Sequence, residues 1–331
     1  MKKQEQSCCE KFKTMIGGQA LIEGIMMRGP EKDAIVVRSG DELNIDVKPR
    51  KLPTKGSIKT WPFIRGTVNF FDAQVTGVKA LMQSADLAPE EMQDEPSKFD
   101  LWLEKKLGSE KFQKALIGFS VALGLCMCVA LFILLPSFLV GFLDQWITHP
   151  VLQNLIEGCV RVLIFTGYML LVSRMNEMKR VFAYHGAEHK TIRCYEAGLP
   201  LTVENVRKMT RLHPRCGTSF LLVVVLLSTL VFSMATSLLA QIPWLDLMQG
   251  TIWHKLIKTC LKLLLLPLVV SIAYEINRLV GRYDNWFTRI LTAPGMWFQH
   301  FTTREPDDSM IEVGIAAVEA VLPEEEGADR W

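Results

Sequence analysis

Residues 115–143 read ALIGFSVALGLCMCVALFILLPSFLVGFL and carry no charged side chain. A helix needs about 20 mainly apolar residues to cross a hydrocarbon core of about 30 Å, so this run predicts a membrane-spanning helix. Pro136 lies within it, and we expect a kink there because proline removes a backbone hydrogen bond. Backbone polar groups cannot stay unpaired in lipid, so we expect the other spanning segments to be helices too.

Three more segments have the length and apolar character of a span, at residues 151–173, 218–242 and 256–280. The first of them contains Glu157 and Arg161, which are spaced to pair on one helical face. Lys262, in the last segment, lies at a similar depth to Glu157, so we expect an ion pair between them that eases insertion. A role of this pair in ion conduction is the functional alternative.

The composition fits a membrane protein and excludes some functions. The chain has 331 residues, 49% of them hydrophobic, with a mean hydropathy of +0.20. A net charge of +2 gives no reason to expect nucleic acid as a partner. The eight cysteines are scattered without a C-x-x-C pair, so we expect reduced thiols. The polar start, MKKQEQSCCEKFK, is not followed by an apolar segment, and we expect no cleavable signal peptide.

Basic residues in the loops predict the orientation. Residues 174–217 contain nine lysines and arginines, whereas the 145–150 connection contains none. Basic loops stay in the cytoplasm, so we expect this loop and both termini there, in a multi-pass protein of the bacterial cytoplasmic (inner) membrane. The lysines at 255, 258 and 262 oppose this orientation but are fewer. The expected partner is the lipid bilayer, with Arg180, Lys190 and Arg193 as candidate contacts to anionic headgroups.

The predicted fold class is mainly α. It comprises a four-helix transmembrane bundle, a small α+β cytoplasmic N-terminal domain and a cytoplasmic metal-site loop. Around the turn Ser39-Gly40-Asp41, alternating β-formers at residues 34–48 predict a hairpin. The predicted divisions are the N-terminal domain and linker at 1–100, spans 1 and 2 at 101–173, the loop at 174–217, spans 3 and 4 at 218–281, and the tail at 282–331. Within the first division, residues 88–99 are predicted to be the linker.

A short helix in the tail is predicted to begin near Asp307 or Asp308, before a disordered acidic end. Arg28, Arg65 and Asp308 need partners, because unpaired buried charges are costly. We therefore expect the N-terminal domain and the tail to pack around the loop helix.

The loop contains a candidate metal site. His185-Gly-Ala-Glu188-His189 is an H-x-x-E-H motif, and on a helix its two histidines project from one face with Glu188 beside them. Gly198 and Pro200 are expected to end this helix. A second helix, capped by Thr202 and running to Leu212, would then bring more donors to the mouth of the third span.

A divalent first-row metal, preferably Zn²⁺, suits these ligands. His185 and His189 are the core pair of metal ligands. The candidates to complete the ligand set are Glu196, His213, Cys216 and Glu275, and the sequence does not choose among them. With an open coordination position, Glu188 would act as the catalytic general base in metal-assisted hydrolysis. The structural alternatives are a solvated histidine-bearing face and, for Cys216, a small buried apolar residue.

Five blocks occur in order along the chain: GGQALIEGIMMRGP (17–30), RGTVNFFDA (65–73), HGAEHKTIRCYE (185–196), HPRCGTSF (213–220) and TTREPDDSMIEV (302–313). Together they resemble the YqhQ-like family of bacterial membrane proteins (domain of unknown function 1385). The resemblance covers nearly the whole chain. It implies a metal-dependent membrane protein and leaves the activity open.

The leading hypothesis is a cytoplasm-facing, membrane-embedded metal hydrolase that acts on a peptide or lipid-linked substrate. The alternative is a non-enzymatic assembly or scaffold protein, in which a closed four-ligand metal site holds the loop in place. An open coordination position distinguishes the two. A small transporter using Glu157, Lys262 and Glu275 is a weaker hypothesis, because four spans leave little room for the repeats that transporters show. The sequence indicates no protein partner.

Overall fold

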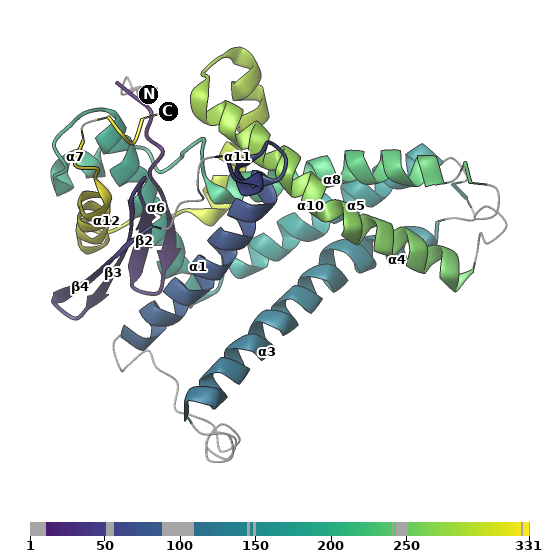
Figure 1. Ribbon diagram of the computed structural model, residues 1–331, viewed down its shortest axis with the longest axis horizontal. Coiled ribbons are helices and arrows are strands. Elements are labelled where there is room, and N and C mark those ends of the chain that lie inside the picture. The colour runs from purple at the N-terminus through teal and green to yellow at the C-terminus, as the bar shows by residue number, and fades with distance from the viewer. Residues whose placement is uncertain are drawn as a thin grey trace. The chain divides into compact units, whose positions relative to one another are not determined.

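The computed structural model describes residues 11–50, 56–87, 109–143, 146–147, 150–239, 241–242, 251–325 and 327–330. The chain is mainly helical, with a small four-stranded antiparallel sheet near its N-terminus (Figure 1). It forms two compact units. The first comprises residues 1–89, 169–224 and 267–331, and the second comprises residues 90–168 and 225–266. The predicted linker at 88–99 lies outside the described residues.

Within the described ranges, four helical stretches are long and apolar enough to cross a membrane, as the sequence predicts. These candidate spans are Gly118–Gly141, Val151–Val172, Gly217–Leu239 and Leu256–Arg282. The helices that contain them are α3 (Ser109–Val129) with α4 (Leu135–Gly141), α5 (Pro150–Val172), α8 (Gly217–Leu239) and α10 (Ile252–Arg282).

The helix of the first span contains a bulge just before Pro136. A π-helical segment, Ala130–Leu134, joins α3 to α4. Proline offers no N–H to the carbonyl four residues before it, and its ring clashes with that carbonyl, which here belongs to Phe132. The Phe132 carbonyl instead accepts a hydrogen bond of 2.8 Å from Arg161 Nε. A charged side chain thus satisfies the carbonyl that the proline leaves free.

A buried charge cluster joins three helices of the second unit. Glu157 Oε1 accepts hydrogen bonds from Arg161 Nη2 at 2.7 Å and from Lys262 Nζ at 2.6 Å. Ser137 Oγ donates to the same oxygen at 2.9 Å, and Lys262 Nζ also donates to Ser137 Oγ. Arg161 is 3% exposed and Lys262 is 5% exposed. Both ion pairs predicted for Glu157 are therefore confirmed.

The sheet of the first unit has the strand order β1-β2-β3-β4, with every neighbouring pair antiparallel. Its strands are Gly17–Leu21, Gly24–Arg28, Lys32–Ser39 and Glu42–Pro49. The predicted hairpin is confirmed, because Ser39 pairs with Glu42 across a two-residue turn. Gly40 occupies the left-handed region there with φ 62°, which glycine adopts at little cost.

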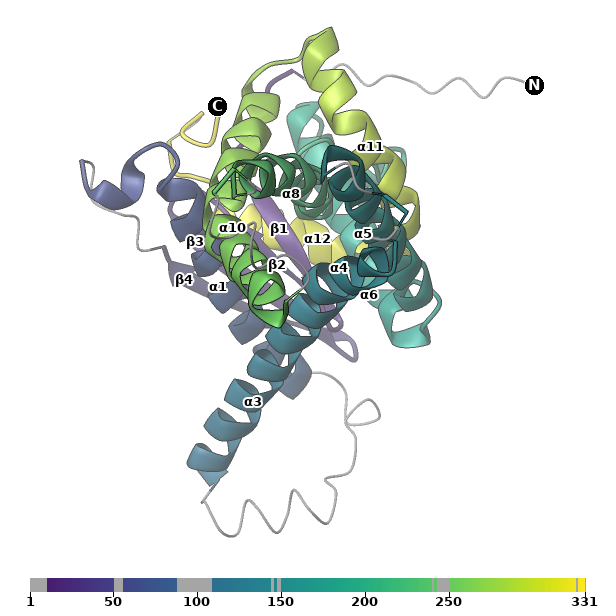
Figure 2. The ribbon, with the colours of Figure 1, turned by 90° about the vertical axis from the view of Figure 1, so that its right-hand side faces the viewer.

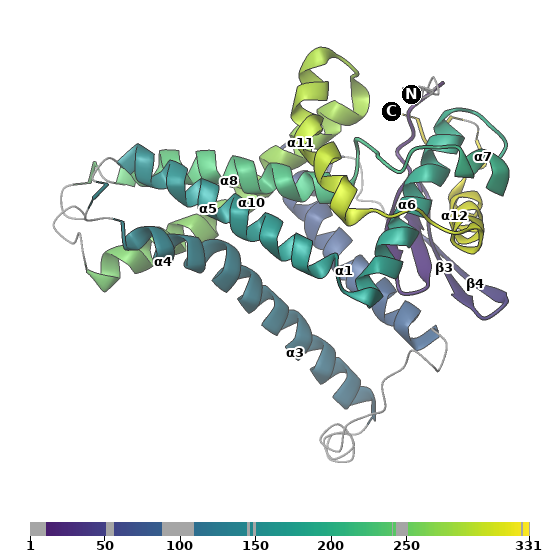
Figure 3. The same ribbon diagram turned by 180° about the vertical axis from the view of Figure 1, so that it is seen from behind.

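The two faces of the sheet bury alternate residues against different helices (Figure 3). On one face, Ile25, Met27 and Val36 pack with α6 (Asn176–Glu196) and α12 (Asp308–Val321). The other face packs through Met26, Ile35 and Val37 against Ala80 of α1 (Arg65–Leu87). The predicted packing of the N-terminal strands and the tail around the loop helix is confirmed.

The tail contains more structure than the sequence predicts. Helix α11 (Trp286–Thr302) was not expected; it follows α10 along the chain (Figure 2) and begins with a capping box between Asn285 and Thr288. Helix α12 begins where predicted, with Asp307 as its N-cap. The expectation of a disordered end is wrong for residues 327–330, because Thr14 pairs with Arg330 and its hydroxyl donates to Asp329 at 2.5 Å.

Candidate metal centre

Helix α6 carries the H-x-x-E-H motif and is held on several sides. Arg180 donates to both carboxylate oxygens of Glu23, at the tip of the β1-β2 hairpin, and Tyr184 donates to one of them. Gly186 packs so closely on the carbonyl oxygen of Arg304 that a Cβ could not be accommodated. The helix ends at Glu196, and Gly198 has φ 62°, as predicted.

The structure brings three donor residues together among those it describes: His185, His189 and Cys216, with their ligand atoms all within 4.8 Å of one another. His185 Nε2 lies 3.1 Å from Cys216 Sγ, and the ring centroids of the two histidines are 4.3 Å apart. These residues are 9%, 1% and 5% exposed, respectively. Two imidazoles and a thiolate are a donor set that Zn²⁺ accepts.

Hydrogen bonds to backbone carbonyls fix both imidazole rings. His185 Nδ1 lies 2.8 Å from the carbonyl oxygen of Thr302, and His189 Nδ1 lies 2.6 Å from that of Arg211. A carbonyl oxygen can only accept, so each Nδ1 carries a proton and donates. When the rings are neutral, each Nε2 therefore keeps a lone pair that a metal can take. Metal-binding histidines show this same arrangement, in which the second ring nitrogen is held by an outer hydrogen bond.

Cys216 sits immediately before α8 and has the environment of a reactive thiol. The N–H of Thr218 donates to its sulfur at 3.4 Å, from the first turn of the helix. Burial raises the pKa of the thiol. The charges of His185 and His189 have a larger combined effect in the opposite direction and bring this pKa well below its usual range. Burial lowers the pKa of His185, but the charge and hydrogen bond of Cys216, together with the charge of Glu188 and the carbonyl of Thr302, outweigh burial and raise this pKa to about 9. The thiol loses its proton readily, as a metal ligand must.

Glu188 lies beside these donors, and only one of its two carboxylate oxygens forms a hydrogen bond among the described residues. Its Oε1 accepts a hydrogen bond of 3.0 Å from the N–H of Gly18 on β1. Oε2 is buried and has no hydrogen-bond partner among the residues that the structure describes. Burial raises the pKa of this carboxyl group, and the nearby histidines only partly offset the effect. A buried carboxylate with a raised pKa and a free oxygen is suited to accept a proton.

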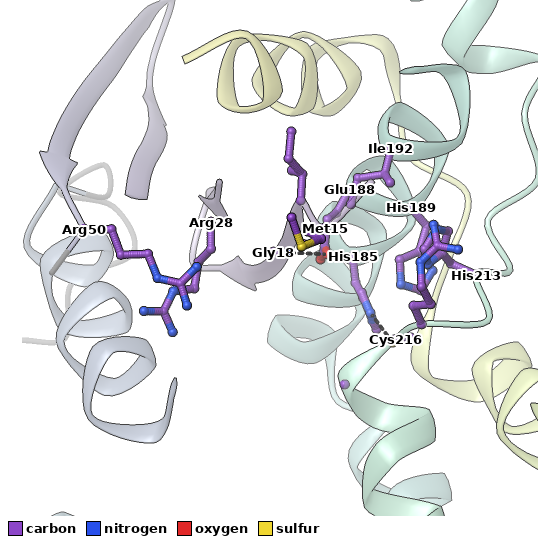
Figure 4. A pocket seen from close by; sticks show the side chains of 14 residues that line it. Met15, Gly18, Arg28, Arg50, His185, Glu188, His189, Ile192, His213 and Cys216 are labelled. Carbon is purple, nitrogen blue, oxygen red and sulfur yellow. Dashed lines mark hydrogen bonds between the residues drawn. The ribbon is translucent and has the colours of Figure 1, made fainter. Parts of the chain in front are cut away.

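These groups line a pocket of about 260 Å³. Figure 4 shows His185 pointing toward Cys216 at one end, and Arg28 and Arg50 at the other. Gly18 and Glu188 lie between the two ends. The pocket thus combines a possible metal position, a carboxylate and basic side chains.

His213 and Glu196 lie in a neighbouring polar cluster. His213 Nε2 lies 3.3 Å from Glu196 Oε2, and Glu196 also accepts hydrogen bonds from Arg215 and from the N–H of Thr14. Gln299 holds the backbone of His213 through two hydrogen bonds. The structure therefore does not group either residue with His185, His189 and Cys216, although the rings of His189 and His213 are only 5.5 Å apart. Glu275, the remaining candidate, forms a two-point ion pair with Arg65.

The loop after α6 explains how Cys216 reaches the histidines. Thr202 caps α7 (Val203–Arg207) as predicted, but this helix ends at Arg207 and does not continue to Leu212. A non-helical segment then follows and is held to α6, because Arg193 donates to the carbonyl of Leu212 and His189 to that of Arg211. This segment of turns and bends returns along α6 and places Cys216 beside His185.

Comparison with known proteins identifies the family. A family model described as "Protein of unknown function (DUF1385)" matches residues 61–324. The chain belongs to the DUF1385 family. A DUF1385-like relative, "Uncharacterized protein YqhQ" of Bacillus subtilis (strain 168), is 32% identical over 312 residues, which cover 92% of each chain. No solved structure matches the chain.

All five sequence blocks lie in the first unit, around the pocket or on the elements that build it, and the four from residue 65 onward lie within the DUF1385 match. The sequence could not identify the backbone groups that orient the site. These are the carbonyls of Thr302 and Arg211 and the N–H of Gly18. Two of the three fall inside the blocks GGQALIEGIMMRGP and TTREPDDSMIEV, which is the signal that pointed to them.

Proposed function

We propose that this protein is a metal-dependent hydrolase embedded in the bacterial cytoplasmic membrane, with its site and both termini on the cytoplasmic side. The observation that carries the proposal is the combination of three convergent donors with an unpartnered Glu188 oxygen in one pocket. Zinc is the preferred metal for imidazole and thiolate donors. A peptide or lipid-linked compound at the bilayer surface is the proposed substrate class.

The chain's own residues divide the chemical work. His185, His189 and Cys216 would hold the metal through Nε2, Nε2 and Sγ. When bound, a divalent cation supplies Lewis acidity and lowers the pKa of water to about 7. Glu188 Oε2 accepts the proton, while the N–H of Gly18 keeps the other carboxylate oxygen in place.

A structural metal site in a scaffold protein is the competing proposal. It gains support from His213, whose ring lies near that of His189 and could serve as a fourth ligand after a small displacement. Structural zinc sites are closed by four protein ligands, whereas catalytic sites use three and leave one position open. The two proposals therefore differ in whether His213 is a ligand.

Metal analysis of the detergent-purified full chain tests both proposals. We expect about one zinc per chain in the wild type and a loss of zinc in His189→Ala, because one of three ligands is removed. His213→Ala should keep its zinc, and His300→Ala, which removes an exposed histidine, is the matched control. Loss of zinc in His213→Ala would favour the closed structural site. A wild type without stoichiometric metal would contradict both proposals.

The orientation has its own test. In a background without native cysteines, Glu204→Cys lies on the exposed surface of α7 and Trp146→Cys lies in the predicted outer connection, where Trp146 is 76% exposed. A membrane-impermeant thiol reagent added to intact spheroplasts should label position 146 and leave position 204 unlabelled until the membrane is opened. The reverse pattern would invert the proposed topology and move the site outside the cytoplasm.

A further inference from the structure

We propose that a second pocket, at the end of α5, binds the phosphate of an anionic lipid headgroup. This pocket has a volume of about 460 Å³, and its basic side chains are Arg211, Arg304 and His300. The inference rests on the membrane assignment made above, but it does not depend on hydrolysis.

The place of the pocket along the chain sets its depth in a bilayer. The candidate span in α5 ends at Val172, and the next residue, Ser173, lines the pocket. Arg304 Nη2 donates to the carbonyl oxygen of Ser173 at 2.9 Å. Because the carbonyl end of a helix carries partial negative charge, this arginine is stabilised there. If α5 crosses the bilayer, Arg304 therefore lies at the level of the headgroups.

The charges around the pocket favour an anion. Arg304 is exposed, and no carboxylate lies within ion-pair distance of it among the described residues. Arg211 lies 3.6 Å from Glu305, which also pairs with Lys190 at 2.5 Å. The pocket is therefore lined by two guanidinium groups and one carboxylate, and that carboxylate is shared with Lys190 outside the pocket, which leaves an excess of positive charge. A guanidinium group presents a planar fork of donors that matches phosphate.

Helix α11 leads from the last candidate span to this pocket along an apolar surface. Trp286, Ile290 and Trp297 share one face of the helix and are 74%, 60% and 58% exposed. The opposite face is buried in the protein through residues such as Phe298. The helix starts soon after α10 ends its candidate span, so the occupant of the exposed face that fits is the bilayer surface. Exposed tryptophans prefer this interface.

The basic residues that the sequence suggested for headgroup contact are engaged within the protein. Arg180 binds Glu23 through two hydrogen bonds, and Arg193 donates to the carbonyl of Leu212. Lys190 is 5% exposed and donates to the carbonyl of Arg207. Arg304 and Arg211 also donate to backbone carbonyls, of Ser173 and Thr303, but unlike the other three they line this pocket, so lipid recognition is assigned to them.

Native mass spectrometry of the full chain in detergent tests this site. We expect phosphatidylglycerol to bind more tightly than phosphatidylcholine with the same acyl chains. Arg304→Gln and Arg211→Gln should each weaken phosphatidylglycerol binding about fivefold, the effect typical of one basic residue near an anionic surface. Arg289→Gln is the matched control, since it removes an exposed arginine of α11 that pairs with Asp284 and lies outside the pocket.

Three outcomes would overturn the proposal. One is unchanged phosphatidylglycerol binding in Arg304→Gln. Another is an equal loss in Arg289→Gln, which would reduce the effect to general surface charge. The last is displacement of the lipid by inorganic phosphate at a comparable concentration, which would show that the pocket takes the free anion. Zinc content measured in the same samples separates this test from that of the hydrolase, because a wild type that holds zinc but shows no preference for phosphatidylglycerol contradicts the lipid site alone.

Discussion

Replacing Glu188 with glutamine is expected to lower hydrolytic turnover by about two to four orders of magnitude while the bound metal stays in place. Glutamine has nearly the same size, and its Oε1 can still accept the hydrogen bond from Gly18. His185, His189 and Cys216 remain to hold the metal. The substitution removes only the group that accepts a proton, so the effect should fall on the rate. Turnover would be measured on a substrate found by screening peptide and lipid-linked compounds, with zinc content determined in parallel.

Glu177→Gln is the matched control, because Glu177 is exposed near the start of the same helix and does not line the pocket. It should leave both turnover and metal unchanged. Loss of metal in Glu188→Gln would make Glu188 a ligand and support the closed structural site. If both metal and turnover survive the change at Glu188, the general-base role is wrong.

The second large effect is expected at Glu157. Glu157→Gln should lower the free energy of unfolding by about 3–5 kcal/mol, the usual cost of removing one partner from a buried ion pair. Arg161 and Lys262 both donate to Glu157 and are both buried, so the substitution leaves two cations without a carboxylate. Thermal unfolding of the detergent-purified protein would measure the loss.

A second substitution tests whether charge is the cause. Glu157→Gln combined with Lys262→Met removes one of the two stranded cations and should recover part of the lost stability. Glu204→Gln is the control, because Glu204 forms an exposed pair with Lys208 and should change stability by less than about 1 kcal/mol. Equal stability of Glu157→Gln and the wild type would contradict a structural role of the cluster and revive the ion-conduction alternative.

The sequence predicted the elements whose signals are local. Runs without charge located the four candidate spans, and glycine and aspartate at helix ends located the ends of α6 and α12. Helix α11 was missed because Pro294 and Gly295 stand in its middle, where both residues normally oppose a helix. Tertiary contacts override this preference: Gly295 is small enough to pack against Ser219, where a Cβ would clash.

The sequence could predict only those residues of the site that lie on one helix. The i,i+4 spacing placed His185 and His189 on one face, but the choice among the other donors depended on contacts between distant segments. Glu196 is bound by Arg215 and by the N–H of Thr14, and Glu275 is bound by Arg65. Cys216 is grouped with the histidines because the chain after α7 is not helical and returns along α6. No local pattern specifies that path.

The two segments that complete the candidate centre are synthesised after all four candidate spans. The carbonyl of Thr302 orients His185, and α12 covers α6, yet both follow all four candidate spans along the chain. During translation, the sheet precedes α6, but α6 emerges long before α12, the second surface that buries it. The donors can reach their final arrangement only after the ribosome has finished residues 302–321. If the proposed metal binds, its loading would consequently follow insertion, and a product terminated before Thr302 would lack the centre even with every donor residue present.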